Sequence, residues 1–427
     1  MIKISYEIKK MRSANGEITV PGDKSISHRA VMFGAIADGV THITGFLKGA
    51  DCLSTIDCFR KMGIEIDVTE DMITVHGKGI NGLSKPSEML YTGNSGTTTR
   101  LLCGLLCAQP FDTDITGDSS ICRRPMGRVT KPLSLMGANI ENEYCPLHIH
   151  GKEITGIDYK MTVASAQVKT ALILAALYAN GDTVIHETEK SRDHTELMLS
   201  AMGANIKVDG LDITVSKTDK LTAQDIDVPG DISSAAFFLV LGLILPDSEI
   251  VIRNVGMNPT RTGIIDVLKD MGADLEIFNE RTATGEPVAD IRVRSSKLHS
   301  TKICGDIIPR LIDELPVIAT AALFADGTTV IADAQELKVK ETDRIKAVCD
   351  EFKKCGADIT PTADGMIIVG NKPLCGADFE TYGDHRMAMS LAILAQRAEG
   401  KSTLSDSKCV DVSYPKFFED FYGLNDV

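Results

Sequence analysis

The stretch SHRAVMFGAIADGVTHITG, residues 27–45, contains the pattern that decides the fold. Polar and basic residues open it, an apolar run follows, and a turn of small residues leads into alternating Thr, Val and Ile. A helix that is apolar on nearly every face is buried, and alternation of apolar and polar residues is typical of a strand. The stretch therefore predicts a buried helix with a polar first turn, followed by a strand.

The same pattern recurs five more times along the chain. The copies are TTTRLLCGLLCAQPFDTDITG from Thr97, AQVKTALILAALYANGDTVIHE from Ala166, ISSAAFFLVLGLILPDSEIVIRN from Ile232, DELPVIATAALFADGTTVIAD from Asp313 and DHRMAMSLAILAQRAEGKSTLSD from Asp384. Between them lies an amphipathic helix that ends at Gly before another strand, as in FRKMGIEIDV from Phe59 and LSAMGANIKV from Leu199. The chain is thus built from six units with a period of about 70 residues, each with two helices and three or four strands.

Six units in 427 residues favour two domains of three units each, although a continuous solenoid is the alternative that periodicity leaves open. The sequence Val-Pro-Gly-Asp occurs at 20–23 and again at 228–231. These sites indicate hinges near 20–22 and 228–230. If the chain crosses at both, residues 21–228 form a domain inserted into one made of 1–20 and 229–427.

Composition excludes several classes of protein. With 45 Lys and Arg against 59 Asp and Glu, the net charge of −14 argues against binding to nucleic acid. The 11 cysteines form no Cys-x-x-Cys pair, and no Gly-x-Gly-x-x-Gly follows a strand, so neither a metal site nor a nicotinamide or flavin cofactor is expected. The chain start lacks a secretory signal, and its apolar runs are too short for a membrane, so we expect a cytoplasmic protein. Because no exposed heptad or apolar stripe is evident, we expect a monomer.

Basic residues open several of the predicted buried helices. The start of a helix carries partial positive charge and binds anions, so Lys24, Arg29 and Arg386 there oppose the helix dipole and point to a bound anion. Ser233, Ser234 and Asp384 have a simpler explanation as helix caps. The histidines at 76, 148 and 150 alternate along strands and are expected at the surface.

Further charged groups lie outside these helix starts. Cys122–Met126 holds paired arginines, and Lys340 and Arg344 are four residues apart, which predicts one helical face with Glu341 alongside. The charge run Glu351–Lys354 is expected to be a solvated helix face. From the residues alone, we interpret the chain as a two-domain enzyme or binding protein for a small ligand with two anionic groups.

Five motifs resemble the 5-enolpyruvylshikimate-3-phosphate synthase family. They are Pro-Gly-Asp-Lys-Ser-Ile-Ser-His-Arg-Ala at 21–30, Gly-Asn-Ser-Gly-Thr-Thr-Thr-Arg at 93–100, Arg-Pro-Met at 124–126, Val-Lys-Glu-Thr-Asp-Arg at 339–344 and Asp-His-Arg-Met-Ala at 384–388. The resemblance implies the two-domain inverse α/β barrel of that family. It also implies transfer of the enolpyruvyl group of phosphoenolpyruvate to the 5-hydroxyl of shikimate 3-phosphate, on the route to chorismate and aromatic amino acids, with no organic cofactor and no obligatory metal.

The resemblance also assigns residues. For shikimate 3-phosphate it implies contacts from Lys24, Ser25, Arg29, Ser165, Gln167, Ser191, Asp313 and Lys340. For phosphoenolpyruvate it implies contacts from Lys24, Asn94, Gly96, Arg124, Gln167, Arg344 and Arg386. The implied catalytic residues are Asp313, Glu341 and Lys24, since the reaction needs a base near the hydroxyl and an acid near the vinyl carbon.

The sequence departs from the family pattern at several positions. Ala166 replaces a frequent Ser, His28 a frequent Asn, and Leu101 a frequent Pro. Val412 stands where many members have Lys, so Lys416 is the candidate to supply that charge. Sensitivity to glyphosate, the family's inhibitor, is not predicted.

Two other functions share part of this pattern. The sister enolpyruvyl transferase that acts on UDP-N-acetylglucosamine carries a reactive Cys about five residues before its Arg-Pro, where this chain has Ser119. A non-catalytic anion-binding scaffold would not require Asp313 and Glu341 together.

Overall fold

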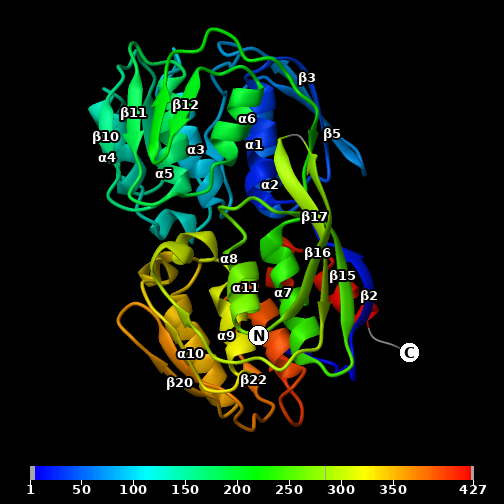
Figure 1. Ribbon diagram of the computed structural model, residues 1–427. Helices are drawn as coiled ribbons and strands as arrows, with labels where there is room; N and C mark the ends of the chain where they lie inside the picture. Colours follow the sequence, from blue (N-terminus) through cyan, green and yellow to red (C-terminus); the bar gives the residue numbers. More distant parts are fainter. Residues whose placement is uncertain (1–4, 284, 425–427) are drawn as a thin grey trace. The chain divides into compact units, whose positions relative to one another are not determined.

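The computed structural model describes residues 5–283 and 285–424 and divides into two compact units (Figure 1). Unit 1 contains the chain up to Pro21, Gly230–Arg281 and the chain from Pro287 onward, whereas unit 2 contains Gly22–Pro229 and Thr282–Glu286. The chain therefore crosses from one unit to the other four times. No helix of the described residues is long and apolar enough to span a membrane.

Unit 2 holds the first three repeats. Its helices are α1 (Lys24–Ala35), α2 (Ala50–Lys61), α3 (Gly96–Leu106), α4 (Gly127–Leu135), α5 (Ala166–Ala176) and α6 (His194–Ala201), with a 3-10 turn η1 (Ile121–Arg123). Its strands are β3 (Asp38–Thr44), β4 (Glu65–Val68), β5 (Met72–Lys78), β6 (Leu90–Tyr91), β7 (Thr113–Thr116), β8 (Asn139–Glu141), β9 (Leu147–His150), β10 (Asp158–Lys160), β11 (Thr183–His186), β12 (Ile206–Asp209), β13 (Asp212–Val215) and β14 (Ile226–Asp227).

Unit 1 holds the other three. Its helices are α7 (Ile232–Ile244), α8 (Gly263–Asp270), α9 (Leu315–Ala322), α10 (Arg344–Lys354), α11 (His385–Ala395) and α12 (Phe417–Gly423), with 3-10 turns η2 (Gly305–Arg310), η3 (Gln335–Val339) and η4 (Lys408–Val412). Its strands are β1 (Tyr6–Glu7), β2 (Asn15–Thr19), β15 (Glu249–Gly256), β16 (Asp274–Ala283), β17 (Glu286–Arg294), β18 (Lys302–Ile303), β19 (Thr328–Ile331), β20 (Asp358–Pro361), β21 (Met366–Val369), β22 (Asp378–Phe379) and β23 (Thr403–Leu404).

Each unit has three sheets of closely similar topology among the described residues. In unit 2 the strand orders are β14-β3-β5-β4, β6-β7-β9-β8 and β10-β11-β13-β12; in unit 1 they are β16-β17-β15-β2, β18-β19-β21-β20 and β1-β23-β22. The strand after each buried helix lies parallel to a neighbour, as in β6 with β7 or β18 with β19. The predicted two-domain α/β fold of six repeats is confirmed.

Two of the sheets each contain a strand that pairs with a strand far away in the sequence. Strand β2, which precedes α1, pairs in parallel with β15 of unit 1, and β14, which precedes α7, pairs in parallel with β3 of unit 2. The two Val-Pro-Gly-Asp sites are joined to each other by two hydrogen bonds. The Asp23 N–H donates to the Pro229 carbonyl at 2.8 Å, and the Asp231 N–H donates to the Pro21 carbonyl at 2.8 Å. Both aspartates also cap the helix that follows.

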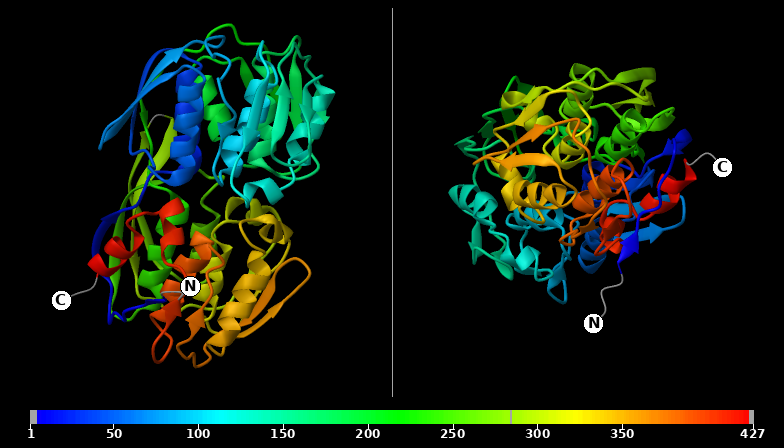
Figure 2. Two further views of the ribbon diagram at one scale, coloured as in Figure 1. Left: turned by 180° about the vertical axis from the view of Figure 1, so that it is seen from behind. Right: turned by 90° about the horizontal axis from the view of Figure 1, so that it is seen from below.

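The buried helices of each unit form its core. Every residue of α7 is buried, and α7, α9 and α11 pack against one another in unit 1. In unit 2, α3 packs against α5 so closely that a Cβ at Gly104 would lie 2.0 Å from the Ala171 carbonyl oxygen. Figure 2 shows the blue start and the red end of the chain in the same unit, where β1 pairs with β23.

Two expectations about charged segments are wrong. Lys340 and Glu341 do not lie on a helix with Arg344, because η3 ends at Val339 and α10 begins only at Arg344, where the Asp343 carboxylate caps it by accepting the Lys346 N–H at 3.1 Å. In the run Glu351–Lys354, Lys353 and Lys354 are exposed as expected, but Glu351 is fully buried rather than solvated, since it accepts the Glu380 N–H and the Tyr382 hydroxyl, each at 2.8 Å.

His76, His148 and His150 are partly exposed, as predicted, and these three and His186 each contact a carboxylate. The closest pairs are His76 with Asp67 (3.2 Å), His148 with Asp114 (2.7 Å), His150 with Glu141 (3.1 Å) and His186 with Asp212 (2.6 Å). The hydrogen bond to Asp212 raises the pKa of His186.

Replacing His186 is expected to change stability in a pH-dependent way. Because the pKa of His186 is raised on folding, its ion pair stabilises the fold below the unfolded-state pKa and loses that effect as the pH rises through the folded-state value. We expect His186→Gln to lower Tm at pH 5 and to match the parent at pH 9, measured by calorimetry. His299→Gln is the control, since the His299 Nδ1 lies near a backbone carbonyl. A Tm deficit that grows toward pH 9 would contradict the assignment.

Candidate active site

The first turn of α1 carries Lys24, a basic residue that opposes the dipole of this helix. Asp23 caps the helix by accepting the Ile26 N–H at 2.9 Å. The Lys24 ammonium forms an ion pair with Asp51 of α2. Lys24 is therefore held by a carboxylate from within unit 2, and an incoming anion would compete with Asp51 for it.

Arg29 lies one turn further along α1 and is almost wholly buried. Its Nε donates to Thr195 Oγ1 at 2.7 Å, Nη2 to Thr170 Oγ1 at 2.8 Å and Nη1 to the Ser25 carbonyl at 2.9 Å. Burial lowers the pKa of Arg29 to about 10, so it stays cationic at neutral pH. The guanidinium thus joins α1 to α5 and α6.

A second basic group surrounds the start of α3. The Arg124 Nη2 donates to Asn94 Oδ1 at 3.0 Å, and the Arg100 Nη1 donates to Gln167 Oε1 at 2.9 Å. A Cβ at Gly96 would lie 2.5 Å from Arg100 Nη1 and 3.5 Å from Arg124 Nη1. The pKa of Arg100 is lowered to about 10, mainly because the side chain is buried and secondly because the charge of Arg124 repels it. An anion at Gly96 would relieve that repulsion.

The segment around Ser191 is held in place by the buried charged side chains of Lys169 and Glu187. Lys169 is fully buried and forms ion pairs with Glu187 at 3.1 Å and Glu196 at 2.7 Å. The Ser191 hydroxyl donates to Glu187, and its carbonyl accepts from the Lys169 ammonium at 3.3 Å. Ser165 caps α5 by accepting the Val168 N–H at 3.4 Å.

Unit 1 gathers its charged side chains around Arg344. This guanidinium is buried and donates to Asp384 at 2.8 Å, to Glu341 at 2.6 Å and to Asp313 at 3.4 Å. Burial opposes its charge, but the three carboxylates outweigh burial and raise the pKa of Arg344 above its ordinary value. The Lys340 ammonium lies 3.2 Å from Asp313. Three carboxylates and two cations therefore alternate within hydrogen-bond distance.

Arg386 completes this group from the first turn of α11. Its Nη1 donates to the Asp313 carbonyl at 3.1 Å, and its N–H donates to Asp384 Oδ1 at 2.9 Å. Asp384 therefore caps α11, as predicted, and also binds Arg344 through both carboxylate oxygens. Within unit 1, all five predicted site residues are brought together.

Several participants were missed from the sequence. Asp51, Arg100 and Glu187 contact predicted site residues, yet none was assigned a role, although Arg100 follows the Gly-Asn-Ser-Gly motif by one helical turn. Lys416 is exposed at the start of α12, where its charge acts on Asp420.

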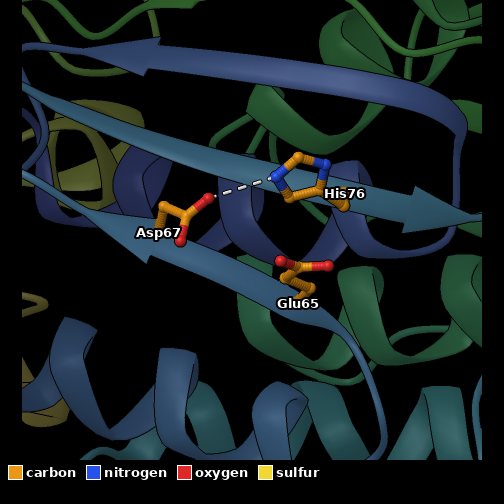
Figure 3. A group of neighbouring side chains, drawn as sticks. All are labelled: Glu65, Asp67 and His76. Atoms are coloured by element: carbon orange, nitrogen blue, oxygen red, sulfur yellow. Dashed lines mark hydrogen bonds and ion pairs between the residues drawn. The ribbon is translucent and has the colours of Figure 1, made fainter.

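One group among the described residues could hold a metal ion, in a place that the sequence did not indicate. Glu65, Asp67 and His76 offer ligand atoms within 4.8 Å of one another. Figure 3 shows them on one face of β4 and β5, with the His76 ring bonded to Asp67. Both carboxylates are exposed. The hydrogen bond that orients the His76 ring is therefore made with Asp67, another member of this group.

Comparison with known proteins agrees with the resemblance that the five sequence motifs indicated. A family model described as EPSP synthase (3-phosphoshikimate 1-carboxyvinyltransferase) matches residues 8–421. The chain belongs to the EPSP synthase family.

Relatives and solved structures agree with the EPSP synthase family model. The 3-phosphoshikimate 1-carboxyvinyltransferase of Thermoanaerobacter sp. (strain X514) is 54% identical over 421 residues, covering 98% of this chain and 99% of the relative. That of Bacillus cereus (strain 03BB102) is 55% identical over 414 residues, covering 96% of each. The EPSP synthase structure from Acinetobacter baumannii at 2.37 Å has a TM-score of 0.89 at 46% identity and covers 99% of this chain and 98% of that chain.

The sequence-based assignment to the EPSP synthase family is thereby confirmed, and with it the reaction. The enzyme transfers the enolpyruvyl group of phosphoenolpyruvate to the 5-hydroxyl of shikimate 3-phosphate and releases phosphate. The charged groups of both units fit that chemistry, because each substrate carries a phosphate and a carboxylate.

Proposed function

We propose how the residues of each unit divide the work of this reaction. Unit 2 supplies contacts to shikimate 3-phosphate from Lys24, Ser25, Arg29, Ser165, Gln167 and Ser191, and unit 1 supplies them from Asp313 and Lys340. For phosphoenolpyruvate, unit 2 supplies Lys24, Asn94, Gly96, Arg124 and Gln167, and unit 1 supplies Arg344 and Arg386. The repulsion between Arg100 and Arg124 beside Gly96 supports an anion at the start of α3.

The chemical step begins when the Asp313 carboxylate accepts the proton of the 5-hydroxyl. The oxygen then adds to C2 of phosphoenolpyruvate, and Glu341 or Lys24 protonates C3 to form a methyl group. In the second step the residue that protonated C3 takes back a proton from the methyl group, the C2–C3 double bond re-forms, and the bond from C2 to the phosphate oxygen breaks. The observation that carries these roles is the contact of Asp313, Lys340, Glu341 and Arg344, in which the Asp313 carboxylate lies 3.2 Å from the Lys340 ammonium and 3.4 Å from the Arg344 guanidinium.

Replacing Glu341 tests which residue moves the methylene proton. If Glu341 is the acid, we expect Glu341→Gln to lower kcat by about 100-fold, since an amide cannot donate that proton. The measurements are phosphate release and, in D₂O, deuterium incorporation at C3 of phosphoenolpyruvate by mass spectrometry. Glu399→Gln, an exposed change in unit 1, is the control. Full deuterium incorporation in Glu341→Gln would assign the proton to Lys24 instead.

We also propose that the enzyme works in the cytoplasm as a monomer. All eleven cysteines are free thiols, which suits a reducing compartment. Burial raises the pKa of Cys107 to about 12, so this thiol is unreactive at neutral pH. Sedimentation of the purified chain measures the oligomeric state.

A further inference from the structure

The first turn of α6 is tied to three different parts of unit 2 through three consecutive residues. His194 contacts Glu286 with its Nδ1 2.7 Å from Oε1, Thr195 accepts from Arg29 at 2.7 Å, and Glu196 pairs with Lys169 at 2.7 Å. All three residues of this turn are buried. The turn follows directly on the Ser191–Asp193 loop, so it fixes one end of that loop, while Glu187 and Lys169 hold Ser191 at the other end.

Glu286 reaches this turn from a distant part of the chain. It lies at the tip of the β16–β17 hairpin, whose strands belong to the sheet of unit 1 while the tip, Thr282–Glu286, groups with unit 2. The residue is only 3% exposed. Burying a carboxylate is unfavourable unless it is paired, so the pairing with His194 has a substantial energetic effect.

The hydrogen bond fixes the His194 ring. A carboxylate accepts, so Nδ1 carries the hydrogen and donates it to Glu286. The other ring nitrogen, Nε2, is buried and has no hydrogen-bond partner among the described residues. Glu286 is therefore the group that sets the orientation of this ring.

The charge of Glu286 also acts on Arg29. Burial has the largest effect on the pKa of Arg29 and lowers it, while Glu196 and Glu286 act in the opposite direction. Glu286 thus stabilises the cation that we assign to shikimate 3-phosphate, and through His194 it holds the turn whose Thr195 orients the same guanidinium.

We propose that Glu286 is a positioning residue for shikimate 3-phosphate: by holding His194 it fixes the first turn of α6 and, through that turn, Arg29 and the Ser191–Asp193 loop. The proposal rests on the proposed assignment of Arg29 and Ser191. It predicts that a residue contributed by the hairpin controls affinity for this substrate without contributing to the chemical step.

The test compares substrate affinity with turnover in the full-length enzyme. Glu286→Gln keeps the shape of the side chain and removes its charge, and a hydrogen bond to a charged group contributes enough that we expect Kd for shikimate 3-phosphate to rise about 10-fold. The KM for phosphoenolpyruvate and kcat at saturation should stay near the parent values. Titration calorimetry and steady-state kinetics measure these quantities, and Glu280→Gln on exposed β16 is the matched control.

His194→Asn is the second variant, because the Asn amide can still donate to Glu286. We expect the double variant Glu286→Gln/His194→Asn to bind no more weakly than Glu286→Gln alone, since the two residues act as one unit. Amide hydrogen exchange of residues 190–196 should accelerate in Glu286→Gln. A lower Tm with unchanged Kd in Glu286→Gln would overturn the proposal. Failure of the parent enzyme to bind shikimate 3-phosphate would instead contradict the proposed function.

Discussion

Asp313→Asn is expected to lower kcat by about 1,000-fold, because an amide cannot accept the proton of the attacking hydroxyl. The amide oxygen can still accept from Lys340, which donates to Asp313 at 3.2 Å, and from Arg344 at 3.4 Å. We therefore expect Kd for shikimate 3-phosphate to change only a few-fold. Phosphate release at saturating substrate concentrations measures kcat, and titration calorimetry measures Kd for shikimate 3-phosphate.

The matched control for Asp313 is Asp306→Asn, an exposed change in η2 of the same unit. It should leave both quantities unchanged. If Asp313→Asn retains the turnover of the parent, Asp313 does not accept the proton. If it instead loses substrate binding with little change in kcat, its carboxylate serves mainly to hold Lys340 and Arg344.

Arg344→Met should have the largest effect on stability. It removes the cation that Asp384, Glu341 and Asp313 share and leaves the fully buried Asp384 without its ion pair. Breaking a buried ion pair on one side costs about 3–5 kcal/mol, so we expect a loss of that size in the free energy of unfolding of unit 1, measured by urea denaturation. Binding of phosphoenolpyruvate should be lost as well.

The next cation of α10 provides the comparison for Arg344. Lys346 pairs with Asp350 at the exposed surface, and such pairs contribute less than about 1 kcal/mol. We expect Lys346→Met to unfold at nearly the urea concentration of the parent. Equal stability losses in the two variants would show that the burial of Arg344 does not matter. Adding Asp384→Asn to Arg344→Met should restore part of the stability, because it removes the unpaired charge.

The repeats and their helix starts could be predicted because they depend on local pattern. The apolar run of α7 identifies a buried helix by itself, and the alternation in β5 identifies a strand. The repeat pattern likewise predicted Lys24 and Arg386 at helix starts, which is where the structure places them.

The partners of these residues could not be predicted, because they come from distant parts of the chain. Nothing near Lys24 indicates that Asp51 would bind it, and Glu286 lies 92 residues from His194. The spacing of Lys340 and Arg344 suggested one helix, yet the Asp343 cap starts the helix after Lys340. The spacing of the charged residues predicted one continuous helix. The chain instead forms a 3-10 turn that ends at Val339 and a separate helix that begins after the Asp343 cap.

The pairing of β2 with β15 and of β14 with β3 also limits the order in which the two units can fold while the chain is being translated. Residues 22–229 include every strand of the three sheets of unit 2, so that unit can assemble before the rest has been translated. Strand β2, although made before any strand of unit 2, has no sheet to join until β15 emerges some 230 residues later. The His194–Glu286 bond forms later still. The last contacts to form next to the Ser191–Asp193 loop are therefore those that require the β16–β17 hairpin.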